Sequence, residues 1–347
     1  MDTTSRNILI IFLFVLVIYI LATLSSILLP LVLAFLIASL FQPIIMFLKK
    51  RKLPNWLILP TVSIITLAIL FGVGVIIAES ASQIIAQKEF LLERLYIKLQ
   101  DTFGFINEIT GMTLSTDLFR DGGKNIFDNN WISGLATGFA QDLGSFTGAF
   151  LMFSLYYVIL LAGMSEYKNY FRYVGGEERG DQFVTNYEMV QRSIYQYMTV
   201  KTLISIATGM LAFAITTAFG IKFAIFWAFL TFLLNYIPSI GSTIATLGPI
   251  VMAFIQFDSF EPIFFLAVSL TTVQMVMGNL VEPIIMGNRL RLNTLTVIFG
   301  LVFWGYIWGV TGMILSVPLL VILKIILERF PEFSIFARIM GYPIKTK

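Results

Sequence analysis

The amino-acid sequence predicts an all-α, polytopic membrane protein with about eight transmembrane segments, a C-terminal re-entrant-like hairpin and an external amphipathic helical lobe. Of its 347 residues, 58% are apolar and only 12% are charged, whereas a soluble domain has about half and a quarter. Charge-free runs such as 8–28, 56–78 and 146–164 are long enough to cross a hydrocarbon core of about 30 Å as helix. They lack the alternation of barrel strands, so helix is the structure that satisfies their backbone in lipid.

The N-terminal apolar region, 8–48, is expected to form an uncleaved helical hairpin. It is far too long for a secretory signal and has no clear cleavage site. Ser25, Ser26 and Pro30 supply the expected turn. Lysine and arginine stay on the cytoplasmic side of a membrane, so the basic loop 49–52 is predicted inside, together with the N-terminus.

A third helix, 56–78, is predicted to lead outward into an external lobe, 79–145. This segment has more acids than bases, which suits the external face. From 84 to 103 its apolar residues recur at helical spacing, which predicts an amphipathic helix that continues the third one. The stretch 111–131 is rich in turn-forming residues and is expected to be loop or short helices. A packing or oligomerisation role for the lobe is favoured over ligand capture.

The chain is then expected to return inside through a fourth helix, 146–164. An apolar stripe over 184–197 indicates an interfacial helix along the cytoplasmic headgroups. Shorter helices, interrupted by glycine and proline, are predicted at 203–219, 223–237, 243–257 and 262–281.

The last apolar run, 294–323, contains no charge. As one helix it would place the basic C-terminal tail outside, so a hairpin that bends at 305–312 is preferred. Its two arms are short for a full span, which favours a re-entrant pair buried in protein or lining a cavity.

Composition excludes several classes of chemistry. The chain has no cysteine and no histidine, so disulfides, thiolate or imidazole metal ligands and histidine proton relays are excluded. We expect no cofactor and no metal centre, although an oxygen-only cation site stays open. The net charge of +3 is not clustered, so no nucleic-acid partner is expected. An enzyme is not expected either, because no paired carboxylates or Ser/Lys pair fall at one membrane depth.

None of the 23 basic and 20 acidic residues is predicted near the middle of a membrane segment, unlike those of most proton pumps. The candidates with an ionisable group near a boundary are Glu79, Lys222, Asp258, Glu261, Glu282, Arg289 and Arg291.

Glu282 is the best placed of these candidates because it precedes Pro283. Proline lacks an N–H and disfavours helix at the residue before it, so the helix is expected to break or kink there. The carboxylate could meet freed backbone donors, a cation, or Arg289 and Arg291 across the turn. A cytoplasmic salt bridge that only pins the turn is an equal alternative.

A similar interruption is expected at 235–241. Asn235 precedes Pro238 as Asn279 precedes Pro283, and Gly241 and Gly287 follow the two prolines. Broken helices with exposed backbone groups build the substrate sites of many transporters. Proline kinks that merely fit helix packing are the commoner alternative. Gln274 and Asn279 could join helices as readily as contact a solute.

Four motifs carry a resemblance to a known family. They are Asn-Tyr-Ile-Pro-Ser-Ile-Gly at 235–241, Val-Glu-Pro-Ile-Ile-Met-Gly at 281–287, Leu-Arg-Leu-Asn-Thr-Leu-Thr-Val at 290–297 and the Trp/Gly-rich stretch 304–318. The chain resembles the AI-2E transporter family, also called the autoinducer-2 exporter or PerM permease family. The resemblance is close over the C-terminal third and extends to the layout of the rest.

This resemblance implies a multi-pass transporter of the bacterial cytoplasmic (inner) membrane that works as a homo-oligomer, with a pentamer among the states it allows. Members are associated with export of the quorum-sensing furanone autoinducer-2, and others with sodium or lithium/proton antiport. Asn293-Thr294 stands where a His-Pro or similar pair often occurs in the family. A role that rests on that histidine therefore cannot transfer.

Three hypotheses follow: a transporter that exports or passes a small polar solute such as autoinducer-2, a Na⁺(Li⁺)/H⁺ antiporter that uses Glu282 and one external acid, and a membrane scaffold with an external binding lobe. The expected partners are the lipid bilayer, a small solute or monovalent cation, and further copies of the chain. Candidate residues of the transport path are Asn235, Pro238, Gly241, Gln274, Asn279, Glu282, Pro283 and Gly287, with Arg289 and Arg291 as charge partners.

The chain is accordingly divided into five segments. N-terminal transmembrane helices occupy 1–78 and the external lobe 79–145. A transmembrane helix and the cytoplasmic interfacial helix occupy 146–202. The core transport region with its broken helices and hairpin spans 203–328, and a cytoplasmic tail spans 329–347. The N- and C-termini are both expected inside.

Overall fold

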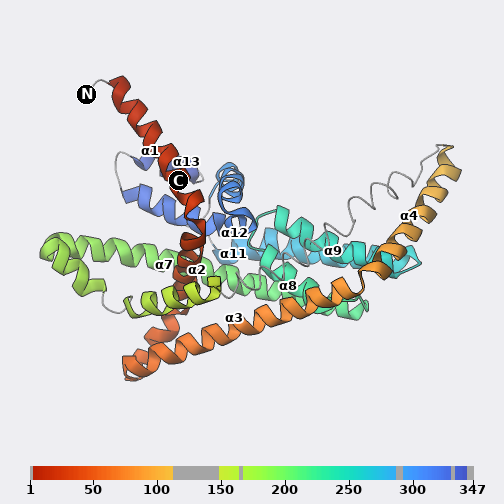
Figure 1. The fold of residues 1–347 in the computed structure, drawn as a ribbon, viewed down its shortest axis with the longest axis horizontal. Coiled ribbons are helices and arrows are strands. Elements are labelled where there is room, and N and C mark those ends of the chain that lie inside the picture. Colours follow the sequence, from red (N-terminus) through yellow and green to blue (C-terminus); the bar gives the residue numbers. More distant parts are fainter. Residues whose placement is uncertain (1–2, 112–147, 164–166, 287–291, 330–332, 342–347) are drawn as a thin grey trace.

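The computed structural model describes residues 3–111, 148–163, 167–286, 292–329 and 333–341 (Figure 1). Within these ranges the regular structure is helical, and the only β-type contact is an isolated bridge between Leu292 and Gly341. Five of the described helices are long and apolar enough to cross a membrane: Ser25–Lys50, Trp56–Ala86, Arg179–Ala218, Phe260–Met286 and Thr294–Glu328. The predicted helical membrane architecture is therefore confirmed at this level.

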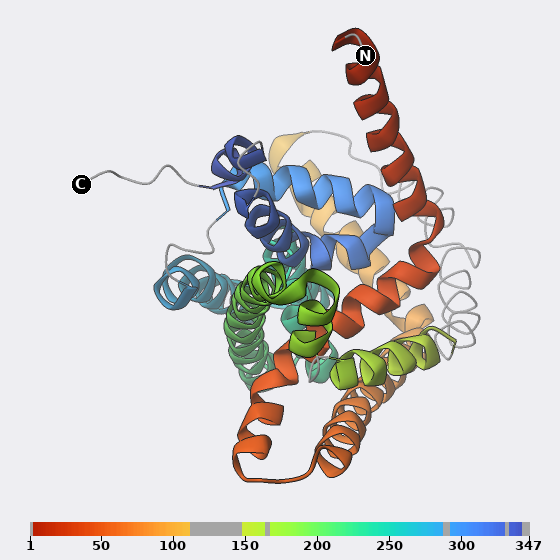
Figure 2. The same ribbon diagram turned by 90° about the vertical axis from the view of Figure 1, so that its left-hand side faces the viewer.

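The predicted N-terminal hairpin is wrong. α1 (Thr3–Thr23) and α2 (Ser25–Lys50) continue as one bent rod instead of folding back on each other (Figures 1 and 2). The backbone N–H of Leu24 donates to the Ile20 carbonyl at 2.9 Å, and that of Leu28 donates to the Leu24 carbonyl at 2.9 Å. Because helical hydrogen bonds cross the junction, Ser25 and Ser26 bend the chain without reversing it.

The third helix continues into the lobe, as predicted. α3 (Asn55–Ala86) bends at Gln87 into α4 (Lys88–Thr110), which ends at Gly111 with a positive φ of 66°. The predicted loop beyond Gly111 lies outside the described residues. The helix Gly148–Gly163 follows and packs against α2 and α3, where Tyr157 is fully buried.

The interfacial helix predicted over 184–197 is also wrong. α7 (Tyr167–Ala218) reverses at Gly176 and then runs to its end without a further interruption. A straight helix cannot lie along the headgroups and then turn across the membrane, so this segment extends the following span. The reversal at Gly176 also requires a glycine at position 180, where the two arms come together. A Cβ at Gly180 would lie 2.6 Å from the Cα of Arg172. The apolar stripe is instead buried against α2 and α12 through residues such as Ile194 and Tyr197.

The predicted interruption at 235–241 is confirmed. α8 (Ala224–Leu234) and α9 (Ile240–Gln256) are joined by a short turn in which Ser239 has a φ of 60°. The C-terminal end of α9 meets the segment that precedes α8. The Gln256 side chain donates to the Gly220 carbonyl at 2.7 Å and accepts from the Lys222 N–H at 3.1 Å. The turn 235–239 therefore points back along α7.

The next stretch of chain is helical throughout. α10 (Phe260–Met275) passes into a π-helical turn, η1 (Val276–Val281), and then into α11 (Glu282–Met286).

The last long helix, α12 (Thr294–Arg329), is folded back on itself. Its backbone leaves helical geometry at Trp308 and at Gly309, whose φ is 61°. A Cβ at Gly312 would lie 2.0 Å from the Trp304 carbonyl oxygen, so the two arms touch at the bend. The predicted position of the bend is thus correct. α13 (Ser334–Met340) returns to the start of this hairpin, where the Asn293 N–H donates to the Met340 carbonyl at 2.9 Å.

Candidate functional site

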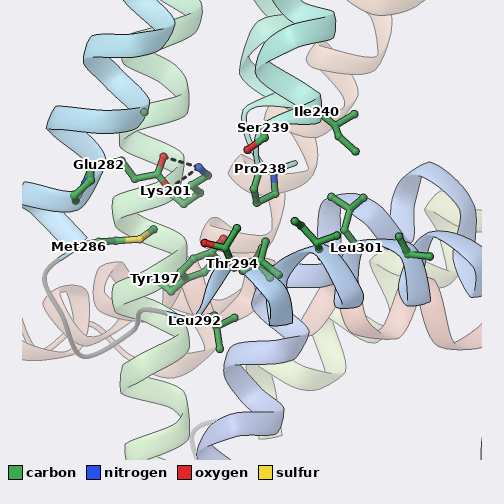
Figure 3. A pocket seen from close by; sticks show the side chains of 16 residues that line it. Tyr197, Lys201, Pro238, Ser239, Ile240, Glu282, Met286, Leu292, Thr294 and Leu301 are labelled. Atoms are coloured by element: carbon green, nitrogen blue, oxygen red, sulfur yellow. Dashed lines mark hydrogen bonds and ion pairs between the residues drawn. The ribbon is translucent and has the colours of Figure 1, made fainter. Parts of the chain in front are cut away.

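An ion pair between Lys201 of α7 and Glu282 of α11 lies at the centre of the candidate site (Figure 3). The Lys201 ammonium nitrogen is 2.7 Å and 2.8 Å from the two carboxylate oxygens of Glu282. The lysine side chain is 5% exposed and the glutamate side chain 23%. Hydrogen bonds between two ionised groups are strong, and each member would be costly to leave unpaired at this depth.

Lys201 was missed by the sequence prediction, which placed no charge near the middle of a membrane segment. It lies inside the long apolar helix that ends at Ala218, about 25 Å from that end at the rise of an α-helix. A signal did exist, because Lys201 continues the helical spacing of the buried residues Ile194 and Tyr197. The predicted partners of Glu282, Arg289 and Arg291, lie outside the described residues.

The sequence predicts a break or a kink at Glu282 and Pro283. The structure has no break there, and the α-helical pattern is instead interrupted by the π-helical turn η1. Glu282 is helical, with φ −59° and ψ −49°, and α11 continues to Met286. The π-helical turn η1, directly before Glu282, explains this. A π turn has a wider hydrogen-bonding pattern, so it accommodates a proline ring and its missing N–H without ending the helix. The same widened turn sets the direction in which the Glu282 side chain leaves the helix.

The turn between α8 and α9 is held against α7 at the level of Lys201. Asn235, which is buried, donates to the Ser205 hydroxyl at 2.9 Å. The hydroxyls of Thr202 and Tyr236 are hydrogen-bonded at 2.7 Å. These contacts place Pro238 and Ser239 beside the ion pair, as Figure 3 shows.

Two cavities meet at this point. The larger, about 820 Å³, is lined mainly by aliphatic side chains, many of them from α12. The smaller, about 540 Å³, is lined by hydroxyl and amide side chains of α9 and α10. Five residues line both cavities: Lys201, Pro238, Ser239, Gly278 and Glu282. The ion pair and the 238–239 turn therefore form the wall between the two cavities.

Most of the predicted path residues are brought together here. Asn235, Gln274 and Asn279 line the smaller cavity, and Pro283 lines the larger one. Gly241 supports the turn from behind, because a Cβ there would lie 1.8 Å from the Leu234 carbonyl oxygen. Gly287 lies outside the described residues.

The two acids predicted to be external, Asp258 and Glu261, are not part of this site. Asp258 precedes α10 and Glu261 lies in its first turn, about 30 Å along the helical rise from Glu282. Asp258 instead contacts the lobe, where Lys98 lies 2.5 Å and Arg94 3.8 Å from its carboxylate oxygen. The hydrogen bond and charge of Lys98, followed by the charge of Arg94, lower the pKa of Asp258.

Known proteins are similar to this chain over most of its length. The sequence model of the family described as AI-2E family transporter matches residues 8–332. A protein of Haemophilus influenzae, provisionally described as a transport protein, is 32% identical over 323 residues, which is 91% of this chain and 90% of that relative. The AI-2 transport protein TqsA of Escherichia coli K12 is 30% identical over 88% of this chain and 86% of TqsA. The chain is a multi-pass membrane protein and belongs to the AI-2E transporter family.

Proposed function

We propose that this protein moves a small polar solute across the membrane through the two adjoining cavities. The observation that carries the proposal is their shared wall, since one change at Lys201 and Glu282 would join them into a single path. Sites between helices with irregular backbone are where many transporters bind their solutes. Autoinducer-2 is the first solute to test, because the relative TqsA is named an AI-2 transport protein.

The lining favours an uncharged solute. Apart from Lys201 and Glu282, every described residue that lines either cavity is uncharged. In the smaller cavity, hydroxyls such as those of Thr243 and Thr271 and the amide of Gln274 offer both donors and acceptors. Such groups can replace the hydrogen bonds that a neutral polar molecule makes with water. They replace the hydration shell of an isolated ion less well.

The antiport hypothesis receives less support from this geometry. It needs a carboxylate that is free to exchange a proton for Na⁺, and both oxygens of Glu282 contact Lys201. The scaffold hypothesis rests only on the lobe, whose α4 contacts the external turn at Asp258.

The proposal includes a membrane arrangement. The protein would lie in a bacterial inner membrane with its C-terminus on the cytoplasmic side, and α12 would enter and leave on that side. The contact between Asn293 and Met340 supports this, because it brings the start of the hairpin to the segment that follows it. The core transport region would extend beyond the predicted 203–328 to include Lys201 of α7. We expect a homo-oligomer such as a pentamer.

Proteoliposomes test the proposed function directly. Autoinducer-2 efflux and Na⁺-dependent pH change are measured on one preparation, and we expect efflux without a Na⁺ requirement. Gln274→Leu should slow efflux, because this side chain lines the smaller cavity. Ser269→Ala on the same helix is the control, since its exposed hydroxyl donates only to the Phe265 carbonyl. A Na⁺-coupled pH change without solute efflux would overturn the proposal in favour of antiport.

A further inference from the structure

We propose that the Lys201–Glu282 ion pair is the barrier that closes the path to ions, and that Lys201 sets its charge selectivity. This inference rests on the proposed function, because it assigns the closed point of the same path. Among the described residues that line the two cavities, this pair is the only charged feature, and it faces both cavities.

Charge compensation explains why the junction would exclude ions. With nitrogen–oxygen distances of 2.7 Å and 2.8 Å, the opposite charges cancel for any ion that approaches through a cavity. An ion that entered the junction could pair with only one member and would leave the other unpaired at a partly buried position, which is costly. An uncharged solute with several hydroxyls could replace the hydrogen bonds of both members at once.

The π-helical turn offers a route for opening the barrier. η1 lies directly before Glu282, and its Gly278 lines both cavities with no atom within 4 Å of the position a Cβ would take. Shifting the helix register by one residue, from π to α, would rotate Glu282 by about 100° around the axis. That rotation separates the carboxylate from Lys201 without unfolding the helix.

Removing the charge of Lys201 and removing the charge of Glu282 should have opposite effects on ion selectivity. Lys201→Met leaves a lone carboxylate at the junction, so the variant should conduct Na⁺ in preference to Cl⁻. Glu282→Gln leaves a lone ammonium and should conduct Cl⁻ in preference to Na⁺. In planar bilayers under a NaCl gradient, the two reversal potentials should shift in opposite directions. The swap Lys201→Glu/Glu282→Lys should restore a barrier as tight as that of the wild type.

Lys98→Met is the matched control, because Lys98 is also an ion-paired lysine but contacts the exposed Asp258. It should leave ion permeability unchanged. Thermal unfolding curves show whether Lys201→Met and Glu282→Gln are folded. If both folded variants conduct the same ion, or if neither conducts, the pair is only a structural contact and the inference is wrong.

Thiol labelling tests the barrier without any cargo. The chain has no cysteine, so Thr246→Cys in the smaller cavity and Val302→Cys in the larger one each introduce a single thiol. A membrane-impermeant thiol reagent should reach each position from one side only, and from both sides after Lys201→Met/Glu282→Gln. If the single-cysteine variants that keep Lys201 and Glu282 are labelled from both sides, the pair is not a barrier, even if solute efflux persists. One-sided labelling without efflux would instead count against the proposed function alone.

Discussion

Gly241→Ala should damage the turn that carries the candidate site. The added Cβ would lie 1.8 Å from the Leu234 carbonyl oxygen, 2.8 Å from its carbonyl carbon and 3.0 Å from the Ile237 Cβ. The closest two are backbone atoms, so the turn itself must move by more than an ångström. Such overpacking typically costs about 1–3 kcal/mol. The better helix propensity of alanine offsets up to about 1 kcal/mol.

The net destabilisation expected for Gly241→Ala is therefore up to about 2 kcal/mol, which for a chain of 347 residues corresponds to a Tm lower by up to roughly 3 °C. Tryptophan fluorescence during heating in detergent measures it. Solute efflux should fall as well, because the displaced turn carries Pro238 and Ser239 of both cavities. Gly72→Ala is the control, since a Cβ there meets no atom within 4 Å. If both variants keep the wild-type Tm and efflux, the reasoning about the turn fails.

Two further predictions concern the lobe and the hairpin. Pairing with Lys98 lowers the pKa of Asp258, so this contact is complete at neutral pH and is lost as acidification, below about pH 4, protonates the carboxylate. Asp258→Asn or Lys98→Met should remove that pH dependence from the protease resistance of the lobe, and an unchanged profile would contradict the assignment. Gly312→Ala should open the α12 hairpin and lower Tm, because its Cβ would lie 2.0 Å from the Trp304 carbonyl oxygen; wild-type Tm would show that the arms can separate freely.

Much of the fold follows from local patterns. Pro238 and Gly241 mark the turn between α8 and α9, and the glycines at 305–312 mark the bend of α12, because these residues act on their own backbone. The same local argument fails at Pro283, where the π turn accommodates the proline. It fails again at Ser25 and Ser26, which bend α1 into α2 without making a hairpin. Neither outcome can be read from residue type alone.

The sequence by itself determined a helical membrane protein without cysteine or histidine, and it located the polar interruptions in the C-terminal half. Only the tertiary structure decided that Glu282 pairs with Lys201, which lies 81 residues earlier in the chain. The physical reason is that periodicity and turn chemistry are local, whereas an ion pair depends on which helices pack together and at what register. The shared wall between the two cavities is a property of that packing.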